Sequence, residues 1–157
     1  MKTAREIMTS TVLSVRPETD IQTLTQLLRS EQISGVPVLD KHARPIGVVS
    51  LYDVAFLGDR EADPSDRQSQ YWGGQSHLPK GYHTLPEGLP RLTVGDIMTS
   101  AVYSVDEAAL LPEICEFFVR GQIHRVLVTK EGELSGIITS TDIIRELVAC
   151  IAPSKAQ

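Results

Sequence analysis

Ile7-Met8-Thr9-Ser10 returns later in the chain as Ile97-Met98-Thr99-Ser100. The match continues beyond this motif, because Gly47-Val48-Val49-Ser50 returns as Gly136-Ile137-Ile138-Thr139. The repeat is longer than the period of solenoid proteins, and it occurs only twice. The sequence therefore predicts two copies of one unit that pair into one closed body, rather than an array that stacks along an axis.

The repeat divides the chain of 157 residues into four segments. We expect the first repeat at 1–57, an insert at 58–92, the second repeat at 93–152 and a tail at 153–157. The insert is polar and broken by glycine and proline, which favours disorder or a wrap along the surface. The alternative is a lid or a partner contact built from its aromatic and histidine residues, which are Tyr71, Trp72, His77, Tyr82 and His83.

The hydrophobic pattern predicts the order β-α-β-β-α in each repeat, and therefore an α/β fold. Thr19-Asp20-Ile21-Gln22 has the form of a capping box, which would start the long helix of the first repeat. Gly121 would end the corresponding helix of the second repeat. The other expected elements are helical turns at 3–8 and 94–98, extended segments at 12–15 and 102–105, strands at 34–39, 45–50, 124–129 and 134–139, and helices at 52–57, 110–120 and 141–151.

Composition and charge argue against several classes of protein. The formal net charge is -5 and lysine and arginine form no dense cluster, whereas nucleic-acid binding needs a basic face. No apolar run approaches the ~18 residues that a membrane span requires. The N-terminus lacks the apolar core of a signal peptide, so we expect a cytoplasmic protein. Cys115 and Cys150 lie in apolar helical segments, where buried thiols are expected rather than a disulfide.

The sequence does not favour an enzyme. A metal-dependent site would need clustered ligands, but the four histidines are scattered without the spacing of a metal site. A Ser-His-Asp hydrolase would need a nucleophile-elbow motif, which the sequence does not contain. We therefore expect neither a catalytic residue nor a bound metal.

A hydroxyl and a carboxylate recur at the start of the last helix of each repeat. Ser50 is followed by Asp53, and Thr139 by Asp142, with the same spacing. A hydroxyl and free backbone N–H groups at a helix start suit a phosphate, and an aspartate on the same turn can accept hydrogen bonds from a ribose diol. The alternative is that each pair only caps its helix, because a duplication copies caps as faithfully as sites.

The two repeats differ at the start of their first hairpin strand. Ser34-Gly35 in the first repeat corresponds to His124-Arg125 in the second. The second repeat thereby gains two potential phosphate donors. The alternatives are a surface ion pair for Arg125 and an ordinary strand position for His124.

Taken together, these motifs resemble a tandem pair of cystathionine β-synthase (CBS) domains, also called a Bateman module. The resemblance covers both repeats and rests on the Ile-Met-Thr motif, the strand Ile33-Ser34-Gly35-Val36-Pro37-Val38 and the final Gly-x-x-Ser/Thr-x-x-Asp. It implies that the repeats pack with pseudo-twofold symmetry and bind adenosine-containing ligands in clefts between them. The ligand-binding residues that it implies are Thr9, Ser34, Val36, Pro37, Ser50, Asp53, Thr99, His124, Arg125, Val126, Thr139 and Asp142.

The resemblance also implies a function. We expect a stand-alone regulatory module that binds AMP, ADP or ATP as a regulatory ligand, uses no catalytic cofactor, forms a homodimer and regulates an effector protein in trans. The ligand could instead be NAD or S-adenosylmethionine. A structural dimerisation module with degenerate clefts is the remaining alternative. Because Ser34-Gly35 lacks the basic pair, phosphate contacts could differ between the two clefts.

Overall fold

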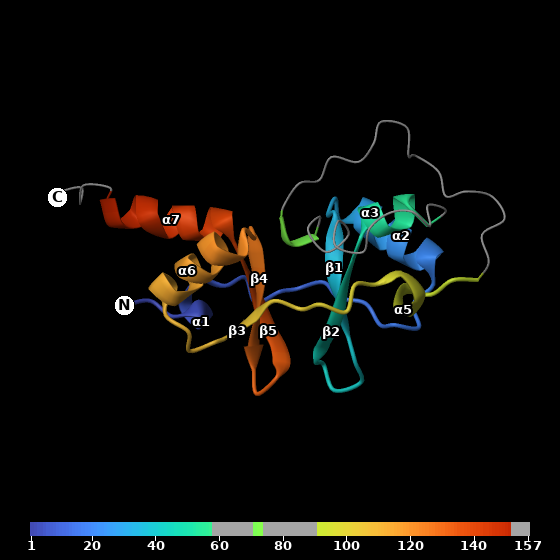
Figure 1. Ribbon diagram of the computed structural model, residues 1–157, viewed down its shortest axis with the longest axis horizontal. Helices are drawn as coiled ribbons and strands as arrows, with labels where there is room; N and C mark the ends of the chain where they lie inside the picture. The colour runs from blue at the N-terminus through green and yellow to red at the C-terminus, as the bar shows by residue number, and fades with distance from the viewer. Residues whose placement is uncertain (58–70, 74–90, 152–157) are drawn as a thin grey trace. The chain divides into compact units, whose positions relative to one another are not determined.

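The computed structural model describes residues 1–57, 71–73 and 91–151, which form parts of two compact units (Figure 1). We call residues 13–102 the central unit, and residues 1–12 together with 103–157 the terminal unit. His77, Tyr82 and His83 of the expected lid or partner contact lie outside the described residues, as does the tail at 153–157. Tyr71 and Trp72 are described, and both belong to the central unit.

The central unit contains a two-stranded antiparallel sheet and three short to medium helices among its described residues. In chain order its elements are α2 (Ile21–Ser30), β1 (Gly35–Leu39), β2 (Pro45–Ser50), α3 (Leu51–Ala55) and α5 (Val94–Ile97). Helix α2 buries Ile21, Leu24 and Leu28, which recur at helical spacing and pack in one apolar cluster with the strand valines. The predicted strands and helices of the first repeat are thus confirmed, apart from its opening strand.

Two details of the first repeat differ from the sequence prediction. The cap of α2 is Asp20 rather than Thr19, since a carboxylate oxygen of Asp20 accepts a hydrogen bond from Thr23 N at 2.8 Å. The Thr19 hydroxyl instead accepts from Arg16 N at 3.2 Å. The extended segment expected at 12–15 is reduced to one parallel bridge between Val15 and Val38.

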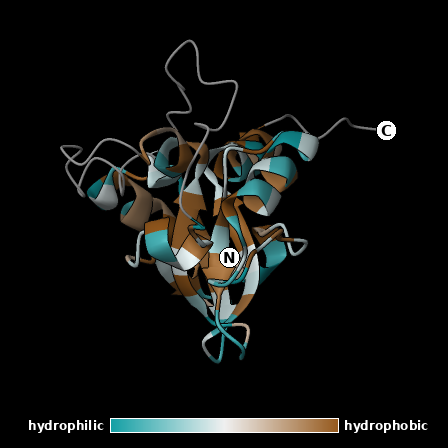
Figure 2. Cartoon of the chain, turned by 90° about the vertical axis from the view of Figure 1, so that its right-hand side faces the viewer, coloured by the Kyte–Doolittle hydropathy of each residue, from teal (hydrophilic) through white to brown (hydrophobic). Residues whose placement is uncertain are grey.

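The terminal unit contains a three-stranded sheet of order β3-β4-β5, in which β3 is parallel and β5 antiparallel to β4. Its elements are α1 (Ala4–Ile7), β3 (Ser104–Asp106), α6 (Leu111–Gly121), β4 (Arg125–Lys130), β5 (Glu133–Thr139) and α7 (Ser140–Ile151). The order β-α-β-β-α predicted for the second repeat is therefore confirmed. In Figure 2 the strands are coloured mainly as hydrophobic and the hairpin turns mainly as hydrophilic.

Two predictions for the second repeat were wrong. Gly121 is the last residue within α6 and does not terminate it. The C-cap is Gln122, whose φ of 51° is left-handed. The thiol of Cys150 is exposed, because α7 buries none of its residues, while Cys115 on α6 is half-buried. Both cysteines are free.

The opening segment of each repeat packs in the unit that holds the hairpin of the other repeat. In the terminal unit, Thr9 N donates to Ile137 O at 2.9 Å, and Ile137 N donates to Thr9 O at 3.0 Å. In the central unit, Val48 and Thr99 exchange the same two hydrogen bonds, both at 2.9 Å. The compact units therefore do not coincide with two contiguous stretches of chain, because the Ile-Met-Thr segments are exchanged.

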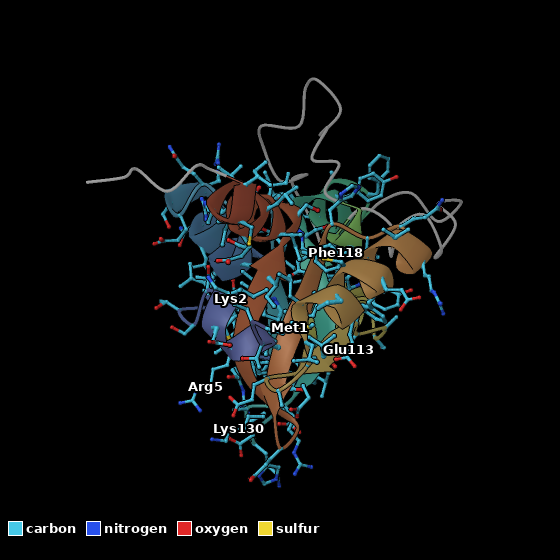
Figure 3. All side chains as sticks on the ribbon, turned by 90° about the vertical axis from the view of Figure 1, so that its left-hand side faces the viewer. Met1, Lys2, Arg5, Glu113, Phe118 and Lys130 are labelled. Atoms are coloured by element: carbon cyan, nitrogen blue, oxygen red, sulfur yellow. The ribbon has the colours of Figure 1, made fainter. Side chains whose placement is uncertain are left out.

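Polar contacts reinforce this exchange in the terminal unit. Arg5 N of α1 donates to Glu107 O at 3.0 Å. The Glu107 carboxylate also lies 3.9 Å from an Arg5 guanidinium nitrogen and 3.5 Å from Lys130 Nζ. Figure 3 shows Arg5 and Lys130 on the same lower edge of this unit. In the same unit, Lys2 Nζ forms an ion pair with Glu146 of α7 at 2.5 Å, and this contact raises the pKa of Lys2.

Candidate functional site

Each unit holds one of the two predicted hydroxyl and carboxylate pairs, at the junction of a strand with a helix. At the Ser50–Asp53 end, Asp53 Oδ2 accepts hydrogen bonds from Ser50 N at 2.7 Å and from Ser50 Oγ at 2.9 Å. At the Thr139–Asp142 end, Asp142 Oδ2 accepts from Thr139 N at 2.8 Å and from Thr139 Oγ1 at 2.7 Å. The capping geometry that the sequence offered as one interpretation is thus present at both ends.

The neighbouring strand is built the same way at both ends. Gly35 is the register partner of Ser50, and Arg125 is the register partner of Thr139. The residue before each of these strands also contacts the helix that follows the hairpin. Ser34 O accepts a hydrogen bond from Leu51 N at 2.8 Å, and His124 O accepts one from Ser140 N at 2.9 Å. The structure therefore brings together Ser34, Ser50 and Asp53 in the central unit, and His124, Arg125, Thr139 and Asp142 in the terminal unit.

The Thr139–Asp142 end is rich in basic groups. His124 is exposed, and its Nδ1 lies 3.3 Å from Ser140 Oγ. Arg125 stands beside Thr139 on the sheet. Arg145 Nη1 lies 3.0 Å from Asp142 Oδ1, in an ion pair whose arginine side chain is 73% exposed. Three cationic or protonatable side chains thus flank the hydroxyl and the carboxylate. This set of hydrogen-bond donors suits a phosphate.

Sequence reasoning did not identify Arg145. A second difference between the repeats could have indicated it. The residue three positions after Asp142 is Arg145, whereas the residue three positions after Asp53 is Phe56. Phe56 packs against Tyr52 with ring centroids 4.3 Å apart. The Ser50–Asp53 end is correspondingly more buried, with both residues 5% exposed.

The remaining predicted site residues lie on the strands of the two sheets or are paired with them. Thr9 pairs with Ile137, two residues before Thr139, and Thr99 pairs with Val48, two residues before Ser50. Val36, Pro37 and Val126 are buried strand residues, and Val36 belongs to the apolar cluster of the central unit. Their contact with a ligand stays a prediction.

The described residues contain no group of three or more histidine, cysteine or acidic side chains that could hold a metal ion. Within the same residues, no helix has both the length and the apolar character needed to cross a membrane. The two ends combine backbone N–H groups, a hydroxyl and a carboxylate, with basic side chains at one end.

Comparison with known proteins identifies the repeats. The model of the CBS domain family matches residues 4–58 and 94–149. The chloroplastic CBS domain-containing protein CBSX1 of Arabidopsis thaliana is 28% identical over 135 residues, covering 83% of this chain and 57% of CBSX1. The chain thus spans little more than half the length of this relative.

Two solved structures are similar over almost the whole chain. Hypoxic Response Protein I, crystallised with two coordinated zinc ions, is 26% identical with a TM-score of 0.66, covering 93% of this chain and 99% of that one. The curated protein of nearly the same name, from Mycobacterium tuberculosis, is 26% identical over 149 residues. CBSX2 in complex with AMP has a TM-score of 0.69 at 24% identity, covering 96% of this chain and 98% of that one, which supports the fold.

Proposed function

This chain belongs to the CBS domain family, and from this premise we propose that it is a regulatory module that binds an adenosine-containing ligand and regulates a partner protein in trans. AMP, ADP and ATP are the first candidates for the ligand. NAD and S-adenosylmethionine share the adenosine group and are the alternatives. We propose a cytoplasmic location and no catalytic role for the chain.

The main support for this proposal is the hydrogen bonding of Asp142 at the Thr139–Asp142 end. One oxygen of Asp142 is held by the cap, and the other accepts a hydrogen bond from the exposed Arg145. A ribose diol could donate to this second oxygen in place of Arg145, because an exposed ion pair is weak. The released guanidinium, together with Arg125 and His124, would then be able to contact phosphate oxygens. The residues present fit a nucleoside phosphate.

A ligand can regulate a partner only if it binds two arrangements of the module with different affinity. The exchanged opening segments offer a direct link between ligand and backbone. Thr9 is hydrogen-bonded to Ile137 on the strand that ends at Thr139. A ligand that shifts the end of β5 would therefore act on the segment that begins the first repeat.

The proposed homodimer is supported by an apolar stripe on α7. Four aliphatic residues at helical spacing are 54% to 69% exposed, and they are Ile144, Leu147, Val148 and Ile151. Such a stripe is unfavourable in water and suits burial against another helix. A second copy of the chain would present the same stripe, as an isologous interface requires.

A thermal-shift screen tests the proposed ligand, because a ligand that binds only the folded state raises the melting temperature by mass action. AMP, ADP, ATP, NAD and S-adenosylmethionine should be screened against the wild type and the double variant Asp53→Ala, Asp142→Ala. The matched control is Asp96→Ala. Asp96 makes the same capping contacts with Thr93, at 2.8 and 2.9 Å, but lies at neither end.

We expect at least one adenine nucleotide to raise the melting temperature of the wild type and of Asp96→Ala, but not that of the double variant. No shift with any of the five ligands would reject the proposed sensor and leave the structural dimerisation module as the interpretation. A shift that the double variant retains would reject the two ends as the site.

A further inference from the structure

Two aromatic residues of the insert are packed into the central unit. The side chains of Tyr71 and Trp72 are only 3% and 1% exposed. Their rings meet edge to face, with centroids 4.8 Å apart and an interplanar angle of 87°. In Figure 1 this short light green segment lies beside β1. Burial of two large rings shows that the segment is an integral part of the unit.

Tyr71 lies directly against Gly35, the first residue of β1. A Cβ atom on residue 35 would be 2.7 Å from Cδ2 of Tyr71 and 3.0 Å from Cε2. Real Cβ atoms do not approach a ring this closely, so the ring takes up space that a side chain at residue 35 would need. The glycine at this position is therefore matched to Tyr71.

The position of the ring relative to the Ser50–Asp53 end follows from the register of the sheet. Gly35 is the partner of Ser50, and directly paired residues of antiparallel strands project from the same face. The Tyr71 ring is on the Cβ side of Gly35. It therefore lies on the face of the sheet from which the Ser50 side chain projects.

In the terminal unit, an arginine side chain of the sheet takes the position that corresponds to the Tyr71 ring. Arg125 is the partner of Thr139, so its side chain leaves the sheet where the Tyr71 ring lies in the central unit. The two ends thus differ in three ways: Arg125 is replaced by Gly35 with Tyr71, Arg145 by Phe56, and His124 by Ser34. Each change removes a phosphate donor or adds an aromatic ring.

We infer that Tyr71 occupies the phosphate position of the Ser50–Asp53 end, so that each chain binds one nucleotide, at the Thr139–Asp142 end. This inference rests on the proposed function. The spacing of Ser50 and Asp53, which the second repeat shares, then serves to cap α3, and the insert makes the two repeats chemically unequal.

The stoichiometry of binding tests this inference. AMP, and ATP in a parallel titration, should be titrated calorimetrically into the wild type, Tyr71→Ala and the ring-retaining control Tyr71→Phe. We expect one nucleotide per chain for the wild type and for Tyr71→Phe. Tyr71→Ala should bind a second, weaker nucleotide, which the added substitution Asp53→Ala should remove.

Trp72 provides a second measurement that needs no variant, because it is the only tryptophan of the chain. Its emission maximum and its quenching by acrylamide should stay unchanged when the wild type is saturated with AMP, since the ring pair remains buried. This readout keeps the inference testable if Tyr71→Ala does not fold.

Three results would overturn the inference while leaving the proposed function intact. These are two nucleotides per wild-type chain, one nucleotide per chain in a folded Tyr71→Ala, and a red shift of Trp72 emission on saturation. Absence of AMP and ATP binding to both the wild type and Tyr71→Ala would instead reject these nucleotides as the ligand of the proposed function, and the inference with them.

Discussion

Replacing Gly47 with alanine should destabilise the protein, because Gly47 lies under the exchanged opening segment of the second repeat. An alanine Cβ would be 2.8 Å from the backbone oxygen of Thr99 and 2.9 Å from Sδ of Met98. The Thr99 carbonyl is fixed by a hydrogen bond from Val48 N at 2.9 Å, so the backbone itself must move. Overpacking of this kind costs about 1–3 kcal/mol.

Part of this cost is offset, because alanine restricts the unfolded chain more than glycine does, by ~0.4–1 kcal/mol. At the middle of both ranges the net loss is about 1–2 kcal/mol. A chain of this size loses roughly 2–4 °C of melting temperature per kcal/mol. We therefore expect the thermal midpoint of Gly47→Ala to lie about 2–8 °C below that of the wild type.

Gly136 provides the matched control. There the nearest atoms all belong to the Met8 side chain, namely Sδ, Cγ at 2.8 Å and Cβ at 3.0 Å. A flexible side chain can move more easily than a backbone carbonyl, so Gly136→Ala should cost less than Gly47→Ala. Adding Met8→Ala should relieve most of the cost of Gly136→Ala, whereas Met98→Ala should relieve only part of the cost of Gly47→Ala, because the contact with the Thr99 carbonyl remains.

Thermal and urea unfolding followed by circular dichroism would measure these differences as two double-mutant cycles. The expected interaction energy is larger for Met8 with Gly136 than for Met98 with Gly47. A midpoint for Gly47→Ala at or above that of the wild type would refute the packing argument. Equal relief in both cycles would show that the Thr99 carbonyl is not the obstacle.

Three further predictions concern charge, assembly and the site. Backbone N–H groups hold the pKa values of Asp20 and Asp96 below their ordinary 3.8. The two carboxylates therefore stabilise the folded state above that pH, and this stabilisation is lost as pH falls through the lowered pKa values. The melting temperature should decrease below about pH 4, and it should decrease less steeply in Asp20→Asn. Leu147→Glu should convert the proposed dimer to a monomer in light scattering, whereas Glu133→Gln, at the exposed first residue of β5, should leave it unchanged. Arg145→Gln should weaken ATP more than adenosine in calorimetry, and equal weakening would exclude a phosphate contact.

The local architecture could be predicted from the sequence because each element has a local cause. The apolar spacing in α2 and the β-branched residues of β1 and β2 define those elements without reference to the rest of the chain. Because the unit is duplicated, the second repeat predicts the same order of strands and helices again. The resemblance to CBS domains, drawn from motifs such as Gly136 to Asp142, is confirmed by the family match.

What the sequence did not predict depends on contacts between distant segments. A repeat cannot show whether Met8 packs against Gly47 or Gly136, since both copies of each motif are nearly identical. Tyr71 lies in an insert without hydrophobic periodicity, so its burial against Gly35 has no local signal. Arg145 was overlooked because one helical turn separates it from the motif that drew attention to Asp142.

Asp142 is proposed to bind the ribose of an adenine nucleotide, and the most direct test of this role is the dissociation constant of AMP for Asp142→Asn beside that for Asp96→Asn. Hydrogen bonds to a charged group contribute about 1.5–3 kcal/mol, which is roughly 10- to 150-fold in affinity. We predict a loss in this range for Asp142→Asn and wild-type affinity for Asp96→Asn. Equal affinity of the two variants for AMP would contradict the claim.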